Sequence, residues 1–419
     1  MIVTLVAALG LAAWLYLLLG RGFFWLARER DDDETSLPMK GRDRPRSGQG
    51  GAVAPTDARD GFTLPHPALR ATLPMKGREA LWPAVAAIVP ARDEADVIAR
   101  SIGSLVGQDY PGEFRVILVD DASADGTAAA ARAVGGGRLE ILAGAPLPAG
   151  WTGKLWAVHQ GIERAARSGR PPAYLLLTDA DIAHAPDNLR RLVARAEAGG
   201  LVLTSLMARL STATWAERLL IPAFVFFFDM LFPFAWVNDP ARPVAAAAGG
   251  CMLVDARILA AAGGIEAIGG EIIDDCALAR LMKARGPIWL GLTHRAVSLR
   301  PYGRFADIAA MVSRSAYAQL RFSPWLLAGT VVGMALIYLA PAVIAVFADG
   351  PARWLGLAAW LAMALAFQPM LRFYRLSALW GLALPLIGAL YGAFTVQSAV
   401  QVWRGRGGMW KGRALARAA

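Results

Sequence analysis

The chain has 419 residues, of which 56% are hydrophobic and 18% charged, with a net charge of +10 and a mean hydropathy of +0.41. Soluble globular proteins have about 45–50% apolar and about 25% charged residues, so this composition excludes an ordinary soluble enzyme and predicts membrane segments. The length excludes a disulfide-stabilised miniprotein. Cys251 and Cys276 lack the spacing of a metal site or a CxxC pair, so we expect reduced thiols.

An N-terminal transmembrane anchor is expected within residues 1–20. Residues 2–19 carry no charge, and a helix of that length rises about 27 Å, enough for a thin bilayer. A cleaved signal peptide would have a basic residue before the apolar run and a small-residue cleavage site after it, and the sequence has neither. Arginines follow the run, so the positive-inside rule predicts that the next part of the chain is cytoplasmic.

Three further apolar stretches, 325–348, 354–371 and 376–403, predict C-terminal membrane segments within 325–403, followed by a basic tail over 404–419. Three crossings would place the basic tail outside the cell, which the positive-inside rule disfavours. The last stretch contains three glycines and a proline, so a segment that bends back is an alternative. The sequence leaves the side of the C-terminus open.

Residues 21–80 are rich in Pro, Gly, Arg and Asp and predict a disordered linker. The string LPMKGR occurs at 37–42 and again at 73–78, which indicates a duplicated linker rather than a repeated fold.

Two other segments border the membrane in our interpretation. The apolar run 215–237 is interrupted by prolines and Asp229, so we expect an interfacial lip for a lipid substrate, with a core helix as the alternative. Residues 311–324 are expected to form an amphipathic juxtamembrane helix.

The central region alternates between two patterns. Apolar runs at 84–90, 114–121 and 174–182 predict buried strands, and amphipathic runs at 94–108 and 154–168 predict helices between them. This alternation is typical of an α/β domain with a largely parallel sheet, in which ligands bind at the carboxyl ends of the strands.

Acidic side chains follow two of these strands. Asp120 and Asp121 end the second, where carboxylates can accept hydrogen bonds from a nucleobase or ribose, or can simply form a turn. Asp179 and Asp181 follow the third, one residue apart. Side chains at i and i+2 share a face of an extended segment, so their oxygens suit Mg²⁺ or Mn²⁺ carrying a diphosphate.

Three further positions are candidates for the site. Lys154 opens a helix, where it can meet a phosphate or remain solvated. Gly249 and Gly250 allow close approach of a ligand or of backbone. Asp274 and Asp275 begin another helix, either as acids that complement its dipole or as the base that deprotonates an attacking hydroxyl.

Five motifs occur in order: VPARDE (89–94), VDDASADGT (119–127), GKLWAVHQG (153–161), TDAD (178–181) and IDDCALA (273–279). With the flanking membrane segments they resemble family 2 glycosyltransferases with a GT-A fold. The stretches WTGKLWAVHQGI, AAAAGGCML, IDDCALARLMKARGPIWLGLT and GMWKGR also resemble hopanoid-biosynthesis-associated glycosyltransferases, relatives of ceramide glucosyltransferases. The resemblance covers about 1–30 and 81–413.

The resemblance implies an α/β fold class: a cytoplasmic GT-A nucleotide-sugar-binding domain over 81–310 with a mostly parallel sheet, plus N-terminal and C-terminal transmembrane helices. It implies that the nucleotide-sugar is bound by Asp93, Glu94, Asp120, Asp121, Lys154, Asp179 and Arg314. It further implies a divalent metal, Mg²⁺ or Mn²⁺, on Asp179 and Asp181, catalysis by Asp275 with Asp274 beside it, and an acceptor side at Gly249 and Gly250. A Gln-x-x-Arg-Trp element of the family has only its arginine here, Arg314, because Met311 and Ser315 stand in the other places.

The expected activity is inverting transfer of a sugar from a nucleotide-sugar donor, such as a UDP-sugar, to a membrane lipid in hopanoid or glycolipid biosynthesis. The expected location is a bacterial-type inner membrane, where other lipid-biosynthesis enzymes are candidate partners. A polyprenyl-phosphate sugar transferase and a non-catalytic scaffold remain alternatives, and a processive polysaccharide synthase is disfavoured by the few spans. Basic residues concentrate beside membrane segments, so nucleic acid is not an expected partner.

Overall fold

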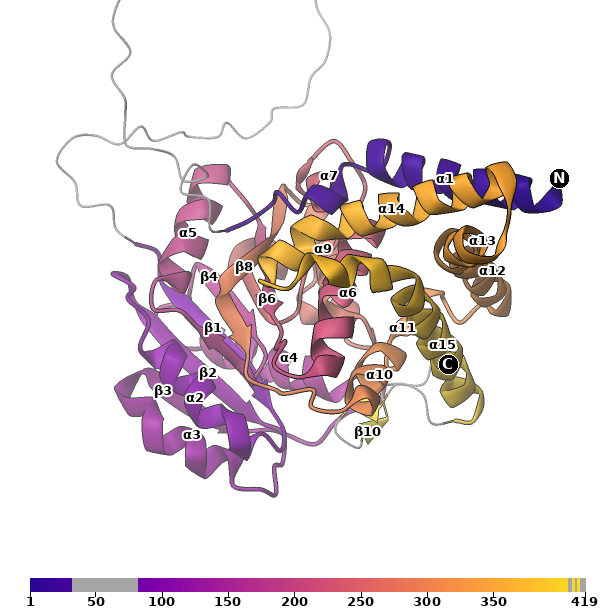
Figure 1. The fold of residues 1–419 in the computed structure, drawn as a ribbon. Coiled ribbons are helices and arrows are strands. Elements are labelled where there is room, and N and C mark those ends of the chain that lie inside the picture. Colours follow the sequence, from indigo (N-terminus) through magenta and orange to yellow (C-terminus); the bar gives the residue numbers. More distant parts are fainter. Residues whose placement is uncertain (32–81, 406–408, 411–412, 415–419) are drawn as a thin grey trace, which may run out of the picture.

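The computed structural model describes residues 1–31, 82–405, 409–410 and 413–414 of the chain. Within these residues an α/β domain adjoins a group of apolar helices, which lies on the right of Figure 1. The duplicated LPMKGR strings lie outside the described residues. In the C-terminal tail, two short strands pair antiparallel: β9 (Met409–Trp410) and β10 (Arg413–Ala414).

The domain is built on one mixed sheet of eight strands. Their order is β3 (Leu139–Ala143), β2 (Phe114–Asp120), β1 (Val85–Ala91), β4 (Tyr174–Thr178), β7 (Cys251–Asp255), β6 (Leu203–Arg209), β8 (Ile288–Ser298) and β5 (Ile182–His184). The first four are mutually parallel, β7 runs antiparallel to β4 and β6, and β8 is parallel to β6 and antiparallel to β5. The predicted α/β class with a mostly parallel sheet is confirmed.

Helices cover both faces of this sheet, which explains why its strands are almost continuously apolar. Alternate residues of β1 enter opposite cores: Val85 and Val89 face one, and Ile88 faces the other. The first core is closed by α2 (Ala95–Val106), α3 (Thr127–Gly135) and α5 (Asn188–Gly199). The second is closed by α4 (Gly153–Ala166), α8 (Ala256–Ala261) and α9 (Asp274–Lys283), with the 3₁₀ turn η4 (Ile265–Ile268).

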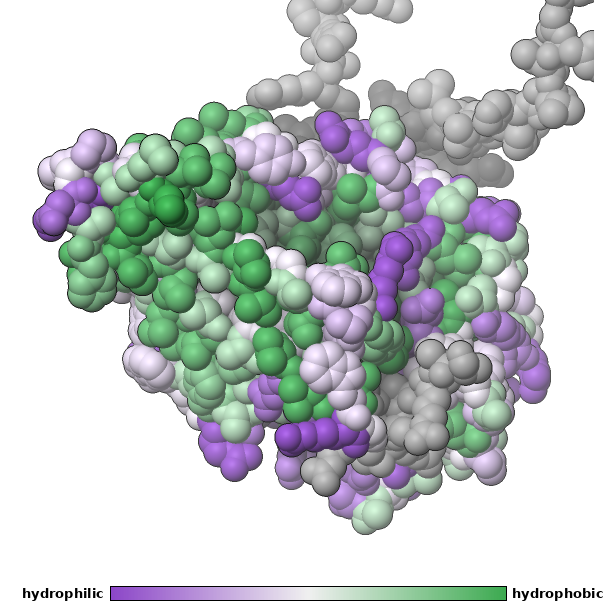
Figure 2. Space-filling model, turned by 90° about the vertical axis from the view of Figure 1, so that its right-hand side faces the viewer, coloured by the Kyte–Doolittle hydropathy of each residue, from purple (hydrophilic) through white to green (hydrophobic). Residues whose placement is uncertain are grey.

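Among the described residues, four helical segments are long and apolar enough to cross a membrane: Ile2–Leu19, Pro324–Phe347, Gly350–Phe373 and Ala378–Trp403. They comprise α1 (Ile2–Leu19), α12 (Pro324–Met334) with the π-helical turn η5 (Ala335–Leu339) and α13 (Ala340–Phe347), α14 (Gly350–Phe373), and η6 (Ala378–Ala383) with α15 (Leu384–Trp403). The predicted N-terminal and C-terminal apolar helices are therefore present. Figure 2 looks at the side on which these helices lie and shows hydrophobic side chains, in green, over much of it.

The two ends of the chain pack together in this helical group. Helix α1 lies along α14 and α13. Pro341 has no N–H to donate to the carbonyl four residues earlier, that of Ile337, and the indole N–H of buried Trp14 donates to this oxygen at 2.9 Å. A tryptophan of the first apolar segment thus satisfies a backbone group that a proline leaves open in the second.

Helix α6 (Trp215–Leu231) occupies the region for which we expect an interfacial lip. It packs against α14, α15, the short 3₁₀ helix η1 (Phe24–Leu26) and α10 (Phe305–Ser313), and most of its side chains are buried inside the protein. The short helix α7 (Phe234–Asn238) follows. Large apolar side chains at Trp215 and Leu231 remain exposed. Contact of this segment with a lipid surface stays a prediction.

The prediction of one amphipathic helix over 311–324 is wrong. Helix α10 ends at Ser313, and a separate short helix, α11 (Ala316–Gln319), follows before α12. The break is stabilised from α15, because the Ser398 hydroxyl donates to the Ser313 carbonyl and accepts from the Tyr317 N–H. These bonds replace those that a continuous helix would make within itself.

Residues 21–31, which we expected to belong to the linker, are part of the fold, and the rest of the expected linker lies outside the described residues. The backbone of this segment bonds to Leu292 of β8 through the Glu29 carbonyl and the Asp31 N–H. The buried Asp31 carboxylate lies 3.2 Å from the Arg295 guanidinium and accepts from the Thr293 hydroxyl. An acid that looks like the start of an acidic linker therefore fastens the N-terminal anchor to the sheet.

Replacing Asp31 with Ala leaves buried donors of β8 without their carboxylate, which costs about 3 kcal/mol. We expect the midpoint of thermal unfolding in detergent to fall by roughly 5 °C. The matched control is Asp109→Ala, which breaks an exposed pair with Arg190 and costs about 1 kcal/mol or less. Equal unfolding midpoints for the two variants would contradict the conclusion that Asp31 holds residues 21–31 against β8.

Candidate functional site

The predicted acidic residues meet at the carboxyl-end edge of β1, β2 and β4. Asp93 adopts a positive φ of 50° in the loop after β1, and its carboxylate accepts from the Ala124 N–H at 2.9 Å. Asp120 accepts from the Ser123 N–H at 3.1 Å. The bond between Asp93 and Ala124 joins the β1–α2 loop to the β2–α3 loop, whereas the bond between Asp120 and Ser123 lies within the β2–α3 loop. Asp93 therefore holds the loop in place. The sequence predicted that Asp93 binds the nucleotide-sugar and did not predict this structural role.

Asp121 is buried beside an arginine that the sequence analysis did not single out. The Arg92 guanidinium donates to the Asp121 carbonyl at 2.6 Å and lies 3.5 Å from its carboxylate. Arg92 directly follows β1 and Asp121 directly follows β2, so this pair joins the carboxyl ends of the two strands. Asp120, at the end of β2, is the more exposed of the two neighbouring acids.

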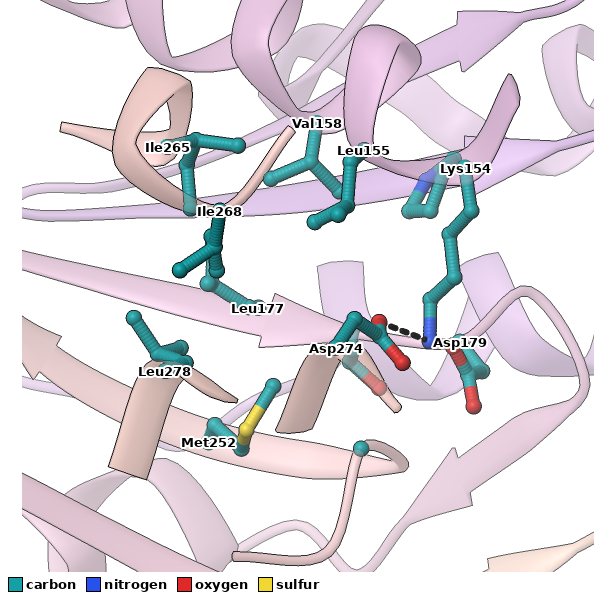
Figure 3. A pocket seen from close by; sticks show the side chains of 13 residues that line it. Lys154, Leu155, Val158, Leu177, Asp179, Met252, Ile265, Ile268, Asp274 and Leu278 are labelled. Atoms are coloured by element: carbon teal, nitrogen blue, oxygen red, sulfur yellow. Dashed lines mark ion pairs between the residues drawn. The ribbon is translucent and has the colours of Figure 1, made fainter. Parts of the chain in front are cut away.

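Lys154 connects two acids from different parts of the chain. Its ammonium lies 2.8 Å from Asp179 Oδ1 and 2.9 Å from Asp274 Oδ2 (Figure 3). Burial would lower the pKa of Lys154, but the two carboxylates outweigh it and raise the pKa above its ordinary value. Burial raises the pKa of Asp179, with Lys154 acting against that rise. Helix α4 presents Lys154 in its first turn, which is capped by Thr152.

Asp275 is held in place by backbone donors. Its Oδ2 accepts from the Gly249 N–H at 3.1 Å, and its Oδ1 accepts from the Cys276 N–H at 2.7 Å. Burial and the neighbouring charge of Asp274 raise the pKa of Asp275 to about 6, while Lys154 and the two N–H groups act in the opposite direction. A carboxylate with such a pKa ionises near neutral pH and is well suited to proton transfer.

Asp179 and Asp181 form an Asp-Ala-Asp motif, and Asp181 contacts a second cation. Arg300, in the loop after β8, places Nε 3.0 Å from Asp181 Oδ2 and its terminal nitrogen 2.6 Å and 2.7 Å from the two oxygens of Glu94. Burial opposes the charge of Arg300, but Asp181 and Glu94 raise its pKa further. The sequence analysis missed this arginine because β8 lies far along the chain from both acids.

Of the remaining predicted site residues, Gly249 lies beside the charged cluster, whereas Gly250 and Arg314 do not. A Cβ on Gly249 would lie 3.3 Å from the Lys154 ammonium and 3.5 Å from Asp275, so Gly249 belongs to the site. A Cβ on Gly250 would instead meet side chains of Ala208 and Ile182 in the sheet. Arg314 is exposed after α10 and forms no direct contact with the acids described above; its charge, like those of Asp181 and Arg300, acts on Tyr302.

An apolar pocket adjoins the charged cluster. Figure 3 shows Lys154, Asp179 and Asp274 at one end and apolar side chains from α4, β4, α9 and η4 around the rest. The apolar lining consists of Leu155, Val158, Leu177, Met252, Ile265, Ile268 and Leu278, together with Pro90. Low polarity on this side strengthens the electrostatic interactions of the charges at the opening.

The donor set fits a divalent metal that shares its coordination with a substrate. Within the described parts of the chain, no group of three or more His, Cys, Asp or Glu side chains could hold a metal ion. Mg²⁺ commonly takes one or two protein carboxylates and completes its shell with phosphate oxygens and waters. Asp179 and Asp181 offer two carboxylates, and the charge of one acts on the other.

Lys283 is a third side chain near the site, after Arg92 and Arg300, that the sequence does not indicate. Its ammonium, at the end of α9, donates to the carbonyls of Trp236, Val237, Asp239 and Val244 at 2.6–3.3 Å. The segment 244–249 is therefore tied to α9 at both ends: by Lys283 at Val244 and by Asp275 at Gly249. A lone lysine in an amphipathic helix gives no sequence signal for such a role.

Comparison with known proteins identifies the domain. Residues 86–259 match the model of a family described as glycosyl transferase family 2. This part of the chain is a family 2 glycosyltransferase domain, so the protein is a glycosyltransferase, and the predicted GT-A fold class is confirmed. The matched residues include Asp93 to Asp181 but end before Asp274 and Asp275. A search of curated proteins gave no match.

Several solved structures are similar to this chain. One is the mannosyltransferase PcManGT from Pyrobaculum calidifontis, in complex with GDP-Man and Mn²⁺, with 20% identity, a TM-score of 0.46, and coverage of 78% of this chain and 91% of that one. Glucosyl-3-phosphoglycerate synthase from Mycobacterium tuberculosis has 17% identity, a TM-score of 0.37, and coverage of 57% and 80%. Mannosyl-3-phosphoglycerate synthase from Rubrobacter xylanophilus has 18% identity, a TM-score of 0.36, and coverage of 57% and 72%.

Adding a methyl group at Gly249 should shift Lys154 without unfolding the domain. We expect Gly249→Ala to lower kcat for sugar transfer on the order of tenfold, because a Cβ 3.3 Å from the Lys154 ammonium forces a small movement of a group that must be accurately placed. Gly103→Ala is the control, since a Cβ there meets nothing within 4 Å. Equal kcat values would show that Gly249 does not constrain the site.

Proposed function

We propose that the protein transfers a sugar from a nucleotide-sugar to a hydroxyl group of a membrane lipid, with inversion at the anomeric carbon. The observation that carries this proposal is the arrangement of Asp275. Its carboxylate is oriented by two backbone N–H groups, has a pKa raised to about 6, and adjoins the Lys154–Asp179–Asp274 cluster. A base and a phosphate-binding cluster side by side are what one direct displacement requires.

The donor is proposed to lie along the edge of β1, β2 and β4. Glu94, Asp120 and Asp121 would accept hydrogen bonds from the base and ribose, and Asp93 would keep their loops in register. Asp179 and Asp181 would hold Mg²⁺ or Mn²⁺, which supplies positive charge to the diphosphate leaving group. Lys154 lies between Asp179 and Asp274, where its ammonium can approach the same phosphates. A UDP-sugar is the donor we expect.

Asp275 is proposed to act as general base. Its ionised carboxylate takes the proton from the acceptor hydroxyl while that oxygen forms a bond to the anomeric carbon. The bond from this carbon to the donor phosphate oxygen breaks, and the nucleoside diphosphate leaves with the electron pair. Because one displacement forms the product, the configuration inverts. Asp274 stays beside Lys154 and raises the pKa of Asp275 through its charge.

The proposal of a lipid acceptor is supported by the elements that surround the site. The loop that carries Arg300 continues into α10 and the apolar helices, and the Tyr302 N–H in this loop donates to Glu217 of α6 at 2.9 Å. Helix α6 is bonded in turn to α15, because the Tyr391 hydroxyl donates to the Leu220 carbonyl at 2.9 Å. An acceptor that enters along these helices would come from the bilayer.

We expect this lipid to be a hopanoid or another glycolipid precursor in a bacterial-type inner membrane, with the catalytic domain on the cytoplasmic side. Other enzymes of lipid biosynthesis would then supply the acceptor. The arginines after α1 support this orientation. Gly249, next to Asp275, would lie on the acceptor side, and Arg314, exposed near Tyr302, would face the headgroup region.

Transfer is tested with the full chain in lipid nanodiscs, with Mn²⁺ or Mg²⁺, a panel of UDP- and GDP-sugars, and extracted hopanoids and polar lipids. We expect lipid-dependent release of nucleoside diphosphate, lowered by about 10³-fold in Asp275→Asn. Asp109→Asn, an exposed acid far from these contacts, should retain activity. Transfer to polyprenyl phosphate alone would show that the protein is a polyprenyl-phosphate sugar transferase. Donor binding without turnover on any lipid would favour a non-catalytic scaffold.

The pH dependence follows from the raised pKa of Asp275. A general base works when ionised, so kcat/KM should rise with pH up to a midpoint near 6 and level off above it. Lys154 lowers the pKa of Asp275, so Lys154→Met should move this midpoint to higher pH as well as lower the rate. An acid limb near pH 4 in the wild type would contradict Asp275 as the base.

A further inference from the structure

The Asp-Ala-Asp motif is neutralised inside the protein by two cations. Lys154 contacts Asp179, and Arg300 contacts Asp181. The two cations come from different elements: Lys154 from the first turn of α4, and Arg300 from the loop between β8 and α10. Each carboxylate proposed to hold the metal thus already has a counter-ion when no donor is bound.

Arg300 is the more exposed of these counter-ions, because 35% of its side chain is exposed against 21% for Lys154. The carboxylates that Arg300 contacts are 10% exposed at Glu94 and 16% at Asp181. Glu94 precedes α2 and is fixed there by its own backbone N–H, which donates to Thr127 at 2.8 Å. If Asp181 turned to another partner, Arg300 could keep its two contacts with Glu94 and present its remaining donors to the space beside Asp181.

We propose that Arg300 is the residue that makes metal and donor bind together. Without donor, its guanidinium occupies Asp181 and competes with a metal for that carboxylate. When metal and donor bind, Asp181 exchanges Arg300 for the metal, and the released guanidinium donates to the diphosphate while Glu94 holds it. This inference rests on the proposed function and adds to it a specific ligand class for Arg300, the nucleoside diphosphate.

The physical reason for cooperativity is the sum of charges. Metal binding alone would leave Arg300 without one of its two carboxylates in a half-buried site. Diphosphate alone would draw Arg300 away from Asp181 and leave that carboxylate without a counter-ion. Binding both restores a partner for every charge. A planar guanidinium suits this exchange because it can contact a carboxylate and a phosphate with different edges.

The test measures Mn²⁺ binding by electron paramagnetic resonance with the full chain in nanodiscs, first with Mn²⁺ alone and then with saturating UDP or GDP. Arg300→Gln frees Asp181, so without nucleotide it should bind Mn²⁺ at least about fivefold more tightly than the wild type. UDP should strengthen Mn²⁺ binding by the wild type at least about fivefold and should strengthen binding by the variant much less.

Arg304→Gln is the matched control, since it removes the same charge four residues away, where Arg304 contacts Asp307 on the surface. It should behave like the wild type. Arg300→Lys, which keeps the charge but has no planar fork, should retain weak Mn²⁺ binding without nucleotide and lose part of the UDP effect. This second variant keeps the test decisive if Arg300→Gln proves unstable in thermal unfolding.

Equal Mn²⁺ affinities of the wild type and Arg300→Gln without nucleotide would overturn the proposal, whatever the transfer assay shows. Tighter Mn²⁺ binding by the variant with an undiminished UDP effect would overturn the contact with the diphosphate. A wild type whose Mn²⁺ binding responds to neither UDP nor GDP would contradict the proposed function itself. The failures of the two proposals are therefore distinguishable.

Discussion

The site depends on one half-buried interaction, the Lys154 ammonium between Asp179 and Asp274. These residues come from α4, the end of β4 and the start of α9, so a single charge joins three elements of the domain. Two carboxylates at this distance would repel each other in a half-buried site, and the lysine removes that repulsion. The same charge limits the rise in the pKa of Asp275 and so keeps the proposed base ionisable near neutral pH.

The sheet supplies the rigid support for this interaction. Both of its faces are covered by helices, so the polar residues of β1, β2 and β4 are confined to the strand ends, where backbone donors and loops meet. Arg92 and Asp93, which follow β1, bond to Asp121 and Ala124 after β2 and so link the two adjacent loops there. The part of the site around Asp275 is fixed differently. Asp275 and Lys283 bind the two ends of the segment 244–249, and this holds the Gly249 N–H against the carboxylate.

The apolar helices and the α/β domain are joined by contacts from both ends of the chain. Asp31 bonds the chain after α1 to β8, and Trp14 packs against the helices at the other end of the sequence. The loop after β8 leads from Arg300 through α10 to the apolar helices, and Tyr302 bonds to Glu217 of α6. A single loop thus carries both a counter-ion of the proposed metal site and the connection to the apolar helices.

The sequence by itself determined the α/β class, the four apolar helices and the strand-end acids, because hydrophobic periodicity and local motifs report which side chains are buried and where strands end. It did not predict Arg300, Arg92 or Lys283, whose partners lie far away in the chain. It also placed a linker at residues 21–31 and a continuous helix over 311–324, where Asp31 finds an arginine of β8 and Ser398 of α15 stabilises a break. Only the tertiary structure decided these points, since a charge or a backbone group takes its role from the partner that folding brings to it, and sequence spacing does not specify that partner.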